Sequence, residues 1–331
     1  MTELKFSVDD NSNTLKFQQL VDAIVDAISR DQLKAGEMLP SVNQIMKESS
    51  LSRDTVFKAY AELKKRGVVE SVPNRGYFVT RKITKIFLFL DTFKAYKEVL
   101  YGSFLKHLPK NISVDLHFHH YNIDLFEKIV LESLGKYSNY IIMNFDHPKI
   151  PGIIQKIPAE QLLVIDWNIY ASENHSAVFQ NFGQPVYDCL KANREKIEKY
   201  REFIYYYPPF TYHPKESIGF FKKFCKDFQM PHSVIFEQEK FKIKKGALYF
   251  LVSDRTLAGF LDQCAEKGYE PGREVGVISY NETPMKKYVK NGITVVSTDF
   301  EMMGQKAAEF VTTGEFMRFE VPTTLKLRSS L

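Results

Sequence analysis

The sequence predicts an α/β protein in which a small N-terminal domain of helices and one hairpin precedes a larger domain of two lobes with parallel sheets. Its 331 residues exceed the roughly 100–200 of a typical single domain. Apolar residues follow a helical period near the N-terminus, and from residue 85 short apolar strands alternate with helical stretches. Such alternation is typical of parallel sheets. We therefore divide the chain into residues 1–82 and 83–331.

The composition is that of an ordinary globular protein, with 44% hydrophobic and 26% charged residues. No run approaches the roughly 18 apolar residues that a membrane span needs, and the first residues lack the apolar core of a signal peptide. The three cysteines are widely spaced and match no metal-ligand pattern. We expect a cytoplasmic protein that makes no membrane contact and carries reduced cysteines.

Three helices and a hairpin are predicted for the first domain. The first helix places six apolar residues at helical spacing, namely Phe17, Leu20, Val21, Ile24, Val25 and Ile28. Ser41 and Ser52 are placed to cap a second and a third helix, and the third turns Val56, Tyr60 and Leu63 inward. Gly67 ends that helix. A strand, a turn and a strand follow, with Pro73, Asn74 and Gly76 as turn residues and Arg75 at the tip.

Positive charge is concentrated in the second half of this domain. Residues 1–46 carry a net charge of −3, whereas residues 47–82 carry +5. Three helices followed by a hairpin form a winged helix, the helix-turn-helix variant whose third helix enters the DNA major groove. A basic helix next to a basic hairpin suits contact with phosphates, although a charge run alone more often marks a solvated surface.

The motifs of this domain resemble one family specifically. The segments "LPSVNQI", "LSRDTVFKAYAELKKRG" and "NRGYFV" are similar, in order and spacing, to the signature of GntR-family transcription regulators over residues 14–80. The resemblance implies that Ser41, Ser52, Arg53, Thr55, Gly76 and Tyr77 approach DNA. Asn43 and Phe57 stand where the family commonly has arginine, so the operator sequence does not transfer. Asn43, Phe57, Lys58 and Arg75 complete the set of residues that we expect at the DNA.

The second domain alternates predicted strands with helices. Strands are expected at residues 85–91, 114–121, 140–145, 162–167, 201–207, 233–237, 247–254, 274–282 and 293–300, with helices at 96–108, 125–134, 215–228, 255–268 and 304–314. Two lobes of similar size, with the chain crossing between them, form a hinged clamp around a small ligand. Such folds bind ligands at the carboxyl ends of their strands.

This domain resembles the sensor domain of the lac-repressor family, which is related to periplasmic sugar-binding proteins. The segments "YFLVSDRTLAGFLDQCAEKGYEPGREVGVISYNETP" and "GITVVSTDFEMMGQKAAEFV" carry the likeness, and the middle of the domain matches weakly. A GntR head joined to such a sensor resembles the arabinose-repressor type of regulator. The family's sensor closes around a monosaccharide or a similar metabolite and changes the angle between paired DNA-binding heads.

Ligand-binding residues are expected at the strand ends. The resemblance points to Asp166, Phe179, Ser253, Asp254, Asn281 and Phe300, and position in the pattern adds Asp91, Phe93, Tyr96, Trp167 and Arg255. Aromatic rings stack on the C–H face of a sugar while polar groups bind its hydroxyls. Phe179 and Phe300 have core packing as an alternative, and Asp254 has helix capping.

Other motifs predict no chemistry. His117, His119 and His120 lie together, but the sequence offers no third ligand beside the pair that shares a strand face, so we expect no metal. The aromatic, proline-broken residues 205–214 are expected to form a loop at the cleft. No phosphate loop or catalytic motif occurs, so we expect neither an enzyme nor a cofactor.

The sequence therefore predicts a homodimeric transcription regulator that binds double-stranded operator DNA. We expect a repressor of a sugar-utilisation operon that a monosaccharide, such as L-fucose or L-arabinose, releases from DNA. No residue excludes the opposite response, in which the same ligand-driven change activates transcription. The alternative is a cytoplasmic sugar-binding or sugar-processing protein whose cleft is catalytic.

Overall fold

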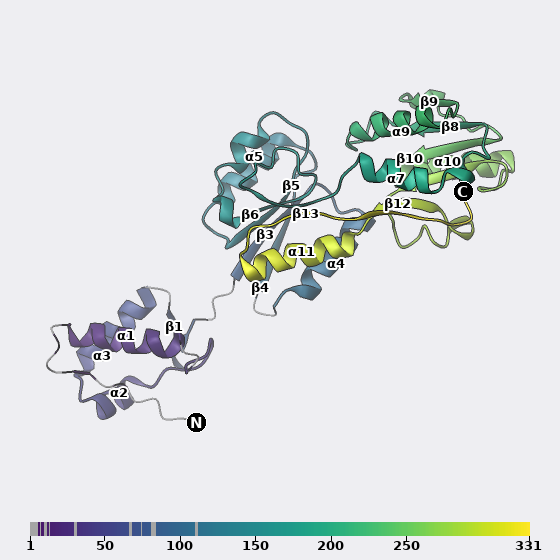
Figure 1. The fold of residues 1–331 in the computed structure, drawn as a ribbon. Helices are drawn as coiled ribbons and strands as arrows, with labels where there is room; N and C mark the ends of the chain where they lie inside the picture. Colours follow the sequence, from purple (N-terminus) through teal and green to yellow (C-terminus); the bar gives the residue numbers. More distant parts are fainter. Residues whose placement is uncertain are drawn as a thin grey trace. The chain divides into compact units, whose positions relative to one another are not determined.

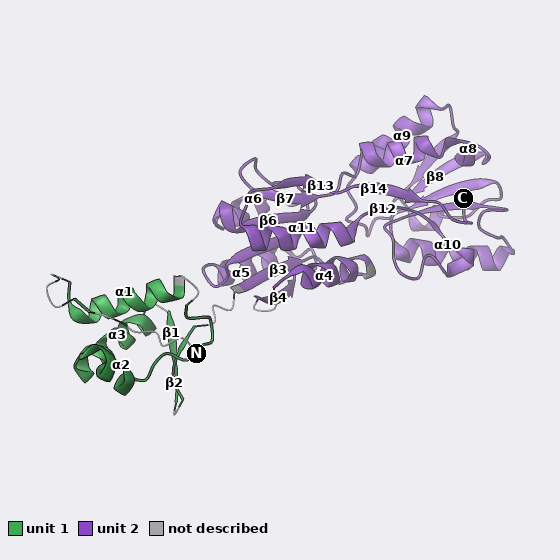
Figure 2. Ribbon diagram, turned by 60° about the horizontal axis from the view of Figure 1, so that its bottom comes forward, with its two compact units in different colours: residues 1–84 green, residues 85–331 purple. Residues whose placement is uncertain are grey.

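The chain forms two compact units, Met1–Thr84 and Lys85–Leu331 (Figure 2). The structure is a computed structural model that describes residues 6, 8–9, 12, 14–29, 32–65, 68–73, 75–80, 84–109 and 112–331. The predicted helix stop at Gly67, the turn residue Asn74 and the predicted domain boundary after Lys82 lie outside these residues. Among the described residues, no helix combines the length and the apolar character that crossing a bilayer requires.

The first unit has the predicted winged-helix order. Its elements are α1 (Lys16–Ser29), α2 (Val42–Ser49), α3 (Arg53–Lys65), β1 (Val69–Val72) and β2 (Gly76–Val79) (Figure 1). The two strands pair antiparallel, as a hairpin requires. Met38 adds a bridge to Phe78, so the segment before α2 lies along the outer edge of the hairpin, which the sequence did not indicate.

Local sequence explains how α2 and α3 begin. The Ser41 side chain accepts a hydrogen bond from the Gln44 amide, and the Ser52 side chain accepts one from the Thr55 amide, each at 3.2 Å. These bonds satisfy backbone donors that a helix start leaves unpaired. The inward stripe of α3 is buried as predicted, since Val56, Tyr60 and Leu63 are fully buried.

The second unit contains two lobes, each with a six-stranded sheet. The N-lobe sheet has the order β13-β7-β6-β5-β3-β4 and the C-lobe sheet the order β14-β12-β11-β10-β8-β9. The N-lobe strands are β3 (Thr84–Leu90), β4 (Ile112–Phe118), β5 (Asn139–Met143), β6 (Leu162–Asp166), β7 (Ser176–Phe179) and β13 (Arg318–Glu320). The C-lobe strands are β8 (Glu202–Tyr206), β9 (His232–Ile235), β10 (Ala247–Leu251), β11 (Gly276–Tyr280), β12 (Thr294–Thr298) and β14 (Thr323–Lys326).

Helices cover both faces of each sheet (Figure 1). In the N-lobe, α4 (Ala95–His107) and α11 (Phe300–Thr313) cover one face, and α5 (Ile123–Ser133) and α6 (Ile150–Ile154) the other. In the C-lobe, α7 (Gln184–Ala192), α8 (Arg194–Ile197) and α9 (Glu216–Asp227) lie opposite α10 (Asp254–Lys267). Central strands such as β6, β10 and β11 are buried along their whole length, as parallel strands covered on both faces should be.

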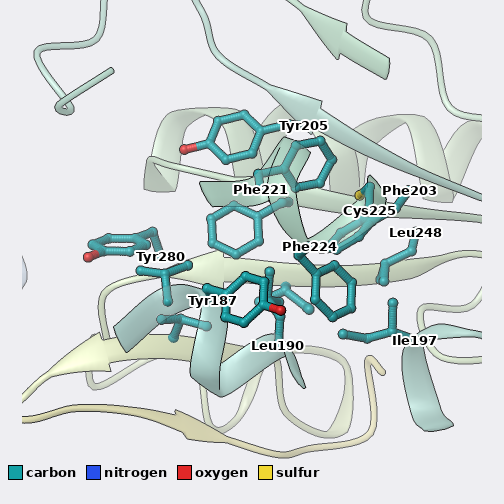
Figure 3. Close-up of a cluster of buried hydrophobic side chains, with 14 of the residues drawn as sticks. Tyr187, Leu190, Ile197, Phe203, Tyr205, Phe221, Phe224, Cys225, Leu248 and Tyr280 are labelled. Atoms are coloured by element: carbon teal, nitrogen blue, oxygen red, sulfur yellow. The ribbon is translucent and has the colours of Figure 1, made fainter. Parts of the chain in front are cut away.

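Aromatic residues dominate the C-lobe core between its sheet and α7 and α9. Phe203, Phe221 and Phe224 pack there with Leu190 and Leu248, and the Tyr280 ring extends from β11 at one side of this cluster (Figure 3). The Phe203 and Phe221 ring centroids are 4.9 Å apart at 70°, an edge-to-face arrangement.

The chain passes between the lobes at three crossover segments, which are residues 180–183, 299 and 321–322. The second returns the chain to the N-lobe, where α11 packs along α4 (Figure 1). Gly304 permits this close approach, since a Cβ there would lie 2.4 Å from the Leu100 carbonyl oxygen. β7, α6, α7, α8, β13 and β14 were not predicted from the sequence, so the crossover segments could not be located in advance.

Candidate functional site

The start of α3 presents exposed polar and basic side chains. Arg53, Lys58 and Ser52 are exposed, and the Phe57 ring is 40% exposed. The Arg53 guanidinium carbon lies 5.5 Å from the centre of the Phe57 ring, so the two side chains share one face as the spacing predicted. The Thr55 hydroxyl lies 2.8 Å from the Ser52 hydroxyl, which ties both to the helix cap.

The other expected DNA-binding residues belong to α2 and the hairpin. Asn43 is exposed on the first turn of α2. Arg75 is exposed beside β2, with its guanidinium carbon 5.6 Å from the Phe78 ring centre. Gly76 has a φ of +109°, a conformation that suits glycine in a turn.

Tyr77 has a structural contact within the first unit. It is only partly exposed, and its ring lies 4.7 Å from that of buried Tyr60. Of the ten residues expected at the DNA, Thr55 and Tyr77 are partly exposed and the other eight are exposed.

A cavity of about 480 Å³ lies between the two lobes of the second unit. Its wall includes eight of the eleven residues expected to bind ligand, which are Asp91, Tyr96, Asp166, Trp167, Ser253, Asp254, Arg255 and Asn281. They come from strand ends, from the loops that follow and from the first turns of α4 and α10. The cavity thus lies at the carboxyl ends of the parallel strands, where such folds bind ligands.

The other three expected residues lie elsewhere. Phe93 is 49% exposed and packs edge-on against Tyr101 and Phe118. Phe179 packs partly buried in the N-lobe core, and Phe300 is a core residue that is 4% exposed. The rings of Phe179 and Phe300 therefore pack in the core, which was the alternative to a place in the ligand pocket. Phe300 does support the cavity wall, since its ring lies 4.5 Å from that of Tyr96.

An ion pair is buried at the N-lobe side of the cavity. The ammonium group of Lys97, a fully buried residue, contacts the Asp91 carboxylate, which also accepts a hydrogen bond from the Tyr121 hydroxyl. Burial lowers the pKa of Lys97 to about 8, although the nearby Asp166 carboxylate opposes this change. Sequence reasoning missed Lys97, because a lysine inside a helical pattern is usually exposed.

Asp166 and Asn281 occupy corresponding places in the two lobes. Asp166 ends β6 with a φ of +70°, and Asn281 follows β11 with a φ of +61°. Aspartate and asparagine tolerate this left-handed backbone better than most residues, and such conformations are often found in binding sites. Burial raises the pKa of Asp166, while Lys97 and a hydrogen bond from Gln180 act in the opposite direction.

Three buried polar atoms of cavity-wall residues have no hydrogen-bond partner among the described residues. They are Oδ1 of Asn144, Nε2 of His213 and Oδ1 of Asn281. The Asn144 amide nitrogen donates to the Ile169 carbonyl oxygen at 3.0 Å, which fixes the orientation of that side chain. Leaving such an atom unpaired costs about 1–3 kcal/mol each. These atoms therefore suit a ligand with several hydrogen-bonding groups.

His213 enters the cavity wall as an uncharged ring. Burial lowers its pKa to about 3, and its ring packs edge-on against Phe182 and Tyr280. A neutral imidazole offers one donor and one acceptor. The sequence had indicated that residues 205–214 form a loop at the cleft, and residues 210–214 do line the cavity, but the role of His213 itself was missed.

Aromatic rings from the two lobes meet at the cavity. The Tyr121 and Tyr212 rings are parallel within 4°, with centroids 3.6 Å apart. On the C-lobe side, the Arg255 guanidinium carbon lies 4.5 Å from the Phe210 ring centre. Phe145, Trp167 and Phe182 extend the aromatic wall. Flat rings beside hydrogen-bonding groups form a surface that can hold a sugar ring.

His119, just after β4, serves packing. His119 is fully buried, its Nε2 lies 3.0 Å from the Met143 carbonyl oxygen, and its ring stacks on Phe145. Burial lowers its pKa to about 3. Within the described part of the chain, no three His, Cys, Asp or Glu side chains are grouped as metal ligands.

Known protein families match part of each unit. Residues 16–79 match the family of bacterial regulatory proteins of the gntR type, and residues 200–330 match a periplasmic binding protein-like domain. The HTH-type transcriptional repressor YtrA of Bacillus subtilis is 29% identical over 73 residues, which are 22% of this chain and 56% of that protein. An uncharacterized HTH-type transcriptional regulator of the same organism, YcxD, is 33% identical over 70 residues, 21% of this chain and 16% of that protein.

Solved structures share the fold of the second unit. The trehalose repressor from Escherichia coli superimposes with a TM-score of 0.61 at 12% identity, covering 73% of this chain and all of that one. A LacI family transcriptional regulator from Lactobacillus casei with bound sucrose superimposes with a TM-score of 0.62 at 15% identity, covering 75% and 99%. At these identities the likeness concerns the fold.

Proposed function

We propose that this chain, which joins a gntR-family helix-turn-helix domain to a periplasmic binding protein-like domain, is a repressor that a small sugar releases from operator DNA. The observation that carries the proposal is this combination in one chain of an exposed basic helix and a ligand cavity with unpaired buried polar atoms. As a DNA-binding regulator, the protein acts in the cytoplasm. The alternative of a catalytic cleft is not favoured, because the relatives are named as regulators.

In this proposal α3 enters the major groove. Arg53 and Lys58 bind bases or phosphates, Asn43 and Arg75 contact the flanking backbone, and Phe57 packs on a thymine methyl group. The exposure of these side chains supports the assignment. Ser41, Ser52, Thr55, Gly76 and Tyr77 hold the backbone in place and approach the phosphates.

We assign the cavity to an uncharged monosaccharide, similar to L-fucose or L-arabinose. Asp166, Asn144 and Asn281 supply acceptors for hydroxyl groups, and Trp167 and Tyr121 supply ring surfaces. The two buried ammonium groups near the cavity, those of Lys97 and Lys286, already contact Asp91 and Asp254. At these two lysines a phosphate group would have to compete with the carboxylates, which favours an unphosphorylated sugar there, whereas Lys94 and Arg255 also line the cavity.

The mechanism is linkage between two binding sites. Helix-turn-helix proteins usually act as dimers that read two half-sites about 34 Å apart, so we expect a homodimer. Sugar binding favours one angle between the lobes, and that angle sets a dimer geometry that no longer fits the operator. The coupling free energy in such systems is typically about 1–3 kcal/mol.

A thermal-shift screen tests the ligand assignment. The full chain is heated with monosaccharides, including L-fucose and L-arabinose, and with the corresponding sugar phosphates as matched controls. A sugar at 100 times its Kd adds about 2.7 kcal/mol to the free energy of unfolding. We expect at least one free sugar to raise the Tm and its phosphate to have no effect. Stabilisation by phosphates alone would contradict the assignment.

A further inference from the structure

The three crossover segments are linked by side chains at the point where they run side by side. Gln180 belongs to the first segment, Thr298 immediately precedes the second, and Thr323 immediately follows the third. The Thr298 hydroxyl donates to Oε1 of Gln180 at 2.9 Å, and the Thr298 and Thr323 hydroxyl oxygens are 2.9 Å apart. Gln180 and Thr298 are both 3% exposed. Any change in the angle between the lobes must therefore accommodate these bonds.

The donor and the acceptor of each hydrogen bond in this network follow from the number of protons that each group carries. The single Thr298 proton is directed to Gln180, so Thr323 must donate its own proton to Thr298. Tyr280 also donates to Oε1 of Gln180, at 3.3 Å. With its oxygen accepting two bonds, the Gln180 amide must turn its nitrogen the other way. That nitrogen donates to the Asp166 carboxylate, which lines the ligand cavity.

Gln180 is held to Asp166 twice. Besides the side-chain bond, the Gln180 backbone amide donates to the Asp166 carbonyl oxygen at 2.9 Å. Backbone bonds also join the segments to one another, from Val321 to Phe179 at 2.7 Å and from Asp299 to Pro322 at 3.1 Å. Among the hydrogen bonds of the described residues in the crossover segments, only that of the Gln180 side chain reaches a carboxylate that lines the cavity.

We propose that Gln180 is the positioning residue that transmits ligand binding at Asp166 to the crossover segments and so sets the angle between the lobes. A ligand hydroxyl that bonds to Asp166 shifts or fixes the carboxylate, and the Gln180 amide follows because its other end is held by Thr298 and Tyr280. Gln180 therefore contributes little to ligand affinity, but it contributes strongly to the free energy that couples ligand binding to the angle between the lobes. The inference rests on the proposed function only in naming a sugar as the group at Asp166.

Hydrogen exchange of the Asp299 and Val321 amides tests this coupling in the full chain without a ligand. These two amides donate to backbone carbonyl oxygens across the crossover segments, and neither donates to the Gln180 side chain. In Gln180→Ala, we expect both amides to exchange about tenfold faster than in the wild type. Thr298→Val keeps the contact between Gln180 and Asp166 but removes one of the two bonds that hold Oε1 of Gln180, since Tyr280 still donates to it, and should therefore speed exchange to a smaller extent. Gln184→Ala is the matched control, because Gln184 donates to the Asp188 carboxylate at an exposed site.

A conservative variant separates a coupling role from a packing role. In Gln180→Glu, two carboxylates face each other once both are ionised at alkaline pH, so there we expect exchange as fast as in Gln180→Ala. In mild acid the pair holds one proton and can form the bond again, so exchange should return to within about twofold of the wild type at the same pH. Unchanged exchange in Gln180→Ala, or no recovery of Gln180→Glu in acid, would overturn the proposal.

A second measurement links the network to regulation. With L-arabinose or L-fucose as the probe, whichever raises the Tm, the ratio of operator Kd with and without sugar should fall towards 1 in Gln180→Ala while the sugar still raises the Tm. An undiminished ratio would contradict the proposal. Failure of both sugars to bind the wild type would instead count against the proposed function, and the exchange measurement would still decide the role of Gln180.

Discussion

The two units present their binding groups in opposite ways. On α3 of the first unit, Arg53 and Lys58 are exposed to solvent, whereas the cavity of the second unit holds the buried Asp166 and the buried Nε2 atom of His213, and both residues have shifted pKa values. Exposed charges act at long range and are screened by salt, while buried polar atoms act at contact distance and are screened little. The comparison indicates that one chain uses two kinds of recognition, which respond differently to solution conditions.

Salt should separate the two binding events most strongly. A protein that neutralises about 6–10 phosphates loses roughly 10³- to 10⁵-fold in DNA affinity between 50 and 200 mM salt. We expect operator affinity to fall in this range, while sugar affinity changes less than about twofold. Fluorescence anisotropy and isothermal titration calorimetry measure the two. Equal salt dependence would contradict the contrast between the units.

Leu63→Ala should destabilise the first unit alone. Leu63 is fully buried in the core of that unit, and truncating a buried leucine costs about 2–5 kcal/mol. We expect scanning calorimetry to show one early transition for the first unit and an unchanged Tm for the second. Leu15→Ala, at a leucine that is 67% exposed, is the control. A parallel loss of Tm in both units would show that they do not unfold independently.

Acid should destabilise the second unit through His119 and His213. Burial lowers the pKa of both to about 3, so below pH 6.5 the unfolded chain takes up protons that the folded chain does not. The free energy of unfolding should therefore fall by roughly 1.4 kcal/mol per pH unit for each histidine as pH drops from about 6.5 towards 3. Denaturant titration of His213→Gln should show a smaller slope, and exposed His232→Gln the wild-type slope.

Arg53→Ala should weaken operator binding and leave sugar binding intact. Loss of one specific arginine contact typically costs about 1–3 kcal/mol, so we expect the operator Kd to rise roughly 5- to 150-fold. Arg273→Ala removes an exposed arginine of the second unit and serves as the control. Loss of sugar affinity together with DNA affinity would mean that the two functions are not divided between the units.

Asn281→Ala should have the smallest and most local effect. Removing its hydrogen bond to the sugar should lower sugar affinity by about 1–2 kcal/mol without changing affinity for the operator. Asn291→Ala is a close control, because Asn291 is exposed and has a φ of +60°, against +61° for Asn281. Both variants therefore carry the same backbone cost. Equal sugar affinity in the two variants would remove Asn281 from the site.

The ease of prediction from sequence also differs between the units. In α3, helical spacing alone places Arg53 and Phe57 on one face and Leu63 in the core, and the structure agrees. In the second unit, the family resemblance pointed to Asp166 and Asn281, and both lie in the cavity wall at the ends of strands, because parallel strands end at a common edge. Asn144 directly follows β5 and could have been found by the same reasoning.

Other cavity residues could not be found in this way. Gln180 follows β7, which the sequence did not indicate, so its place in a crossover segment was hidden. Whether an aromatic ring turns to the cavity or to the core depends on packing between distant segments, which explains why Phe179 and Phe300 lie outside the wall, while Phe93 lies outside it and is half-exposed. Lys97 is buried only because Asp91 lies beside it after folding.

The most direct test is the operator affinity of the full chain with and without a sugar that raises its Tm. An operator is first selected from random double-stranded DNA, and the Kd is then measured by fluorescence anisotropy at constant salt. We expect the sugar to raise the operator Kd by about 5- to 150-fold, as a coupling of 1–3 kcal/mol implies. An unchanged Kd at a saturating concentration of the bound sugar would contradict the account.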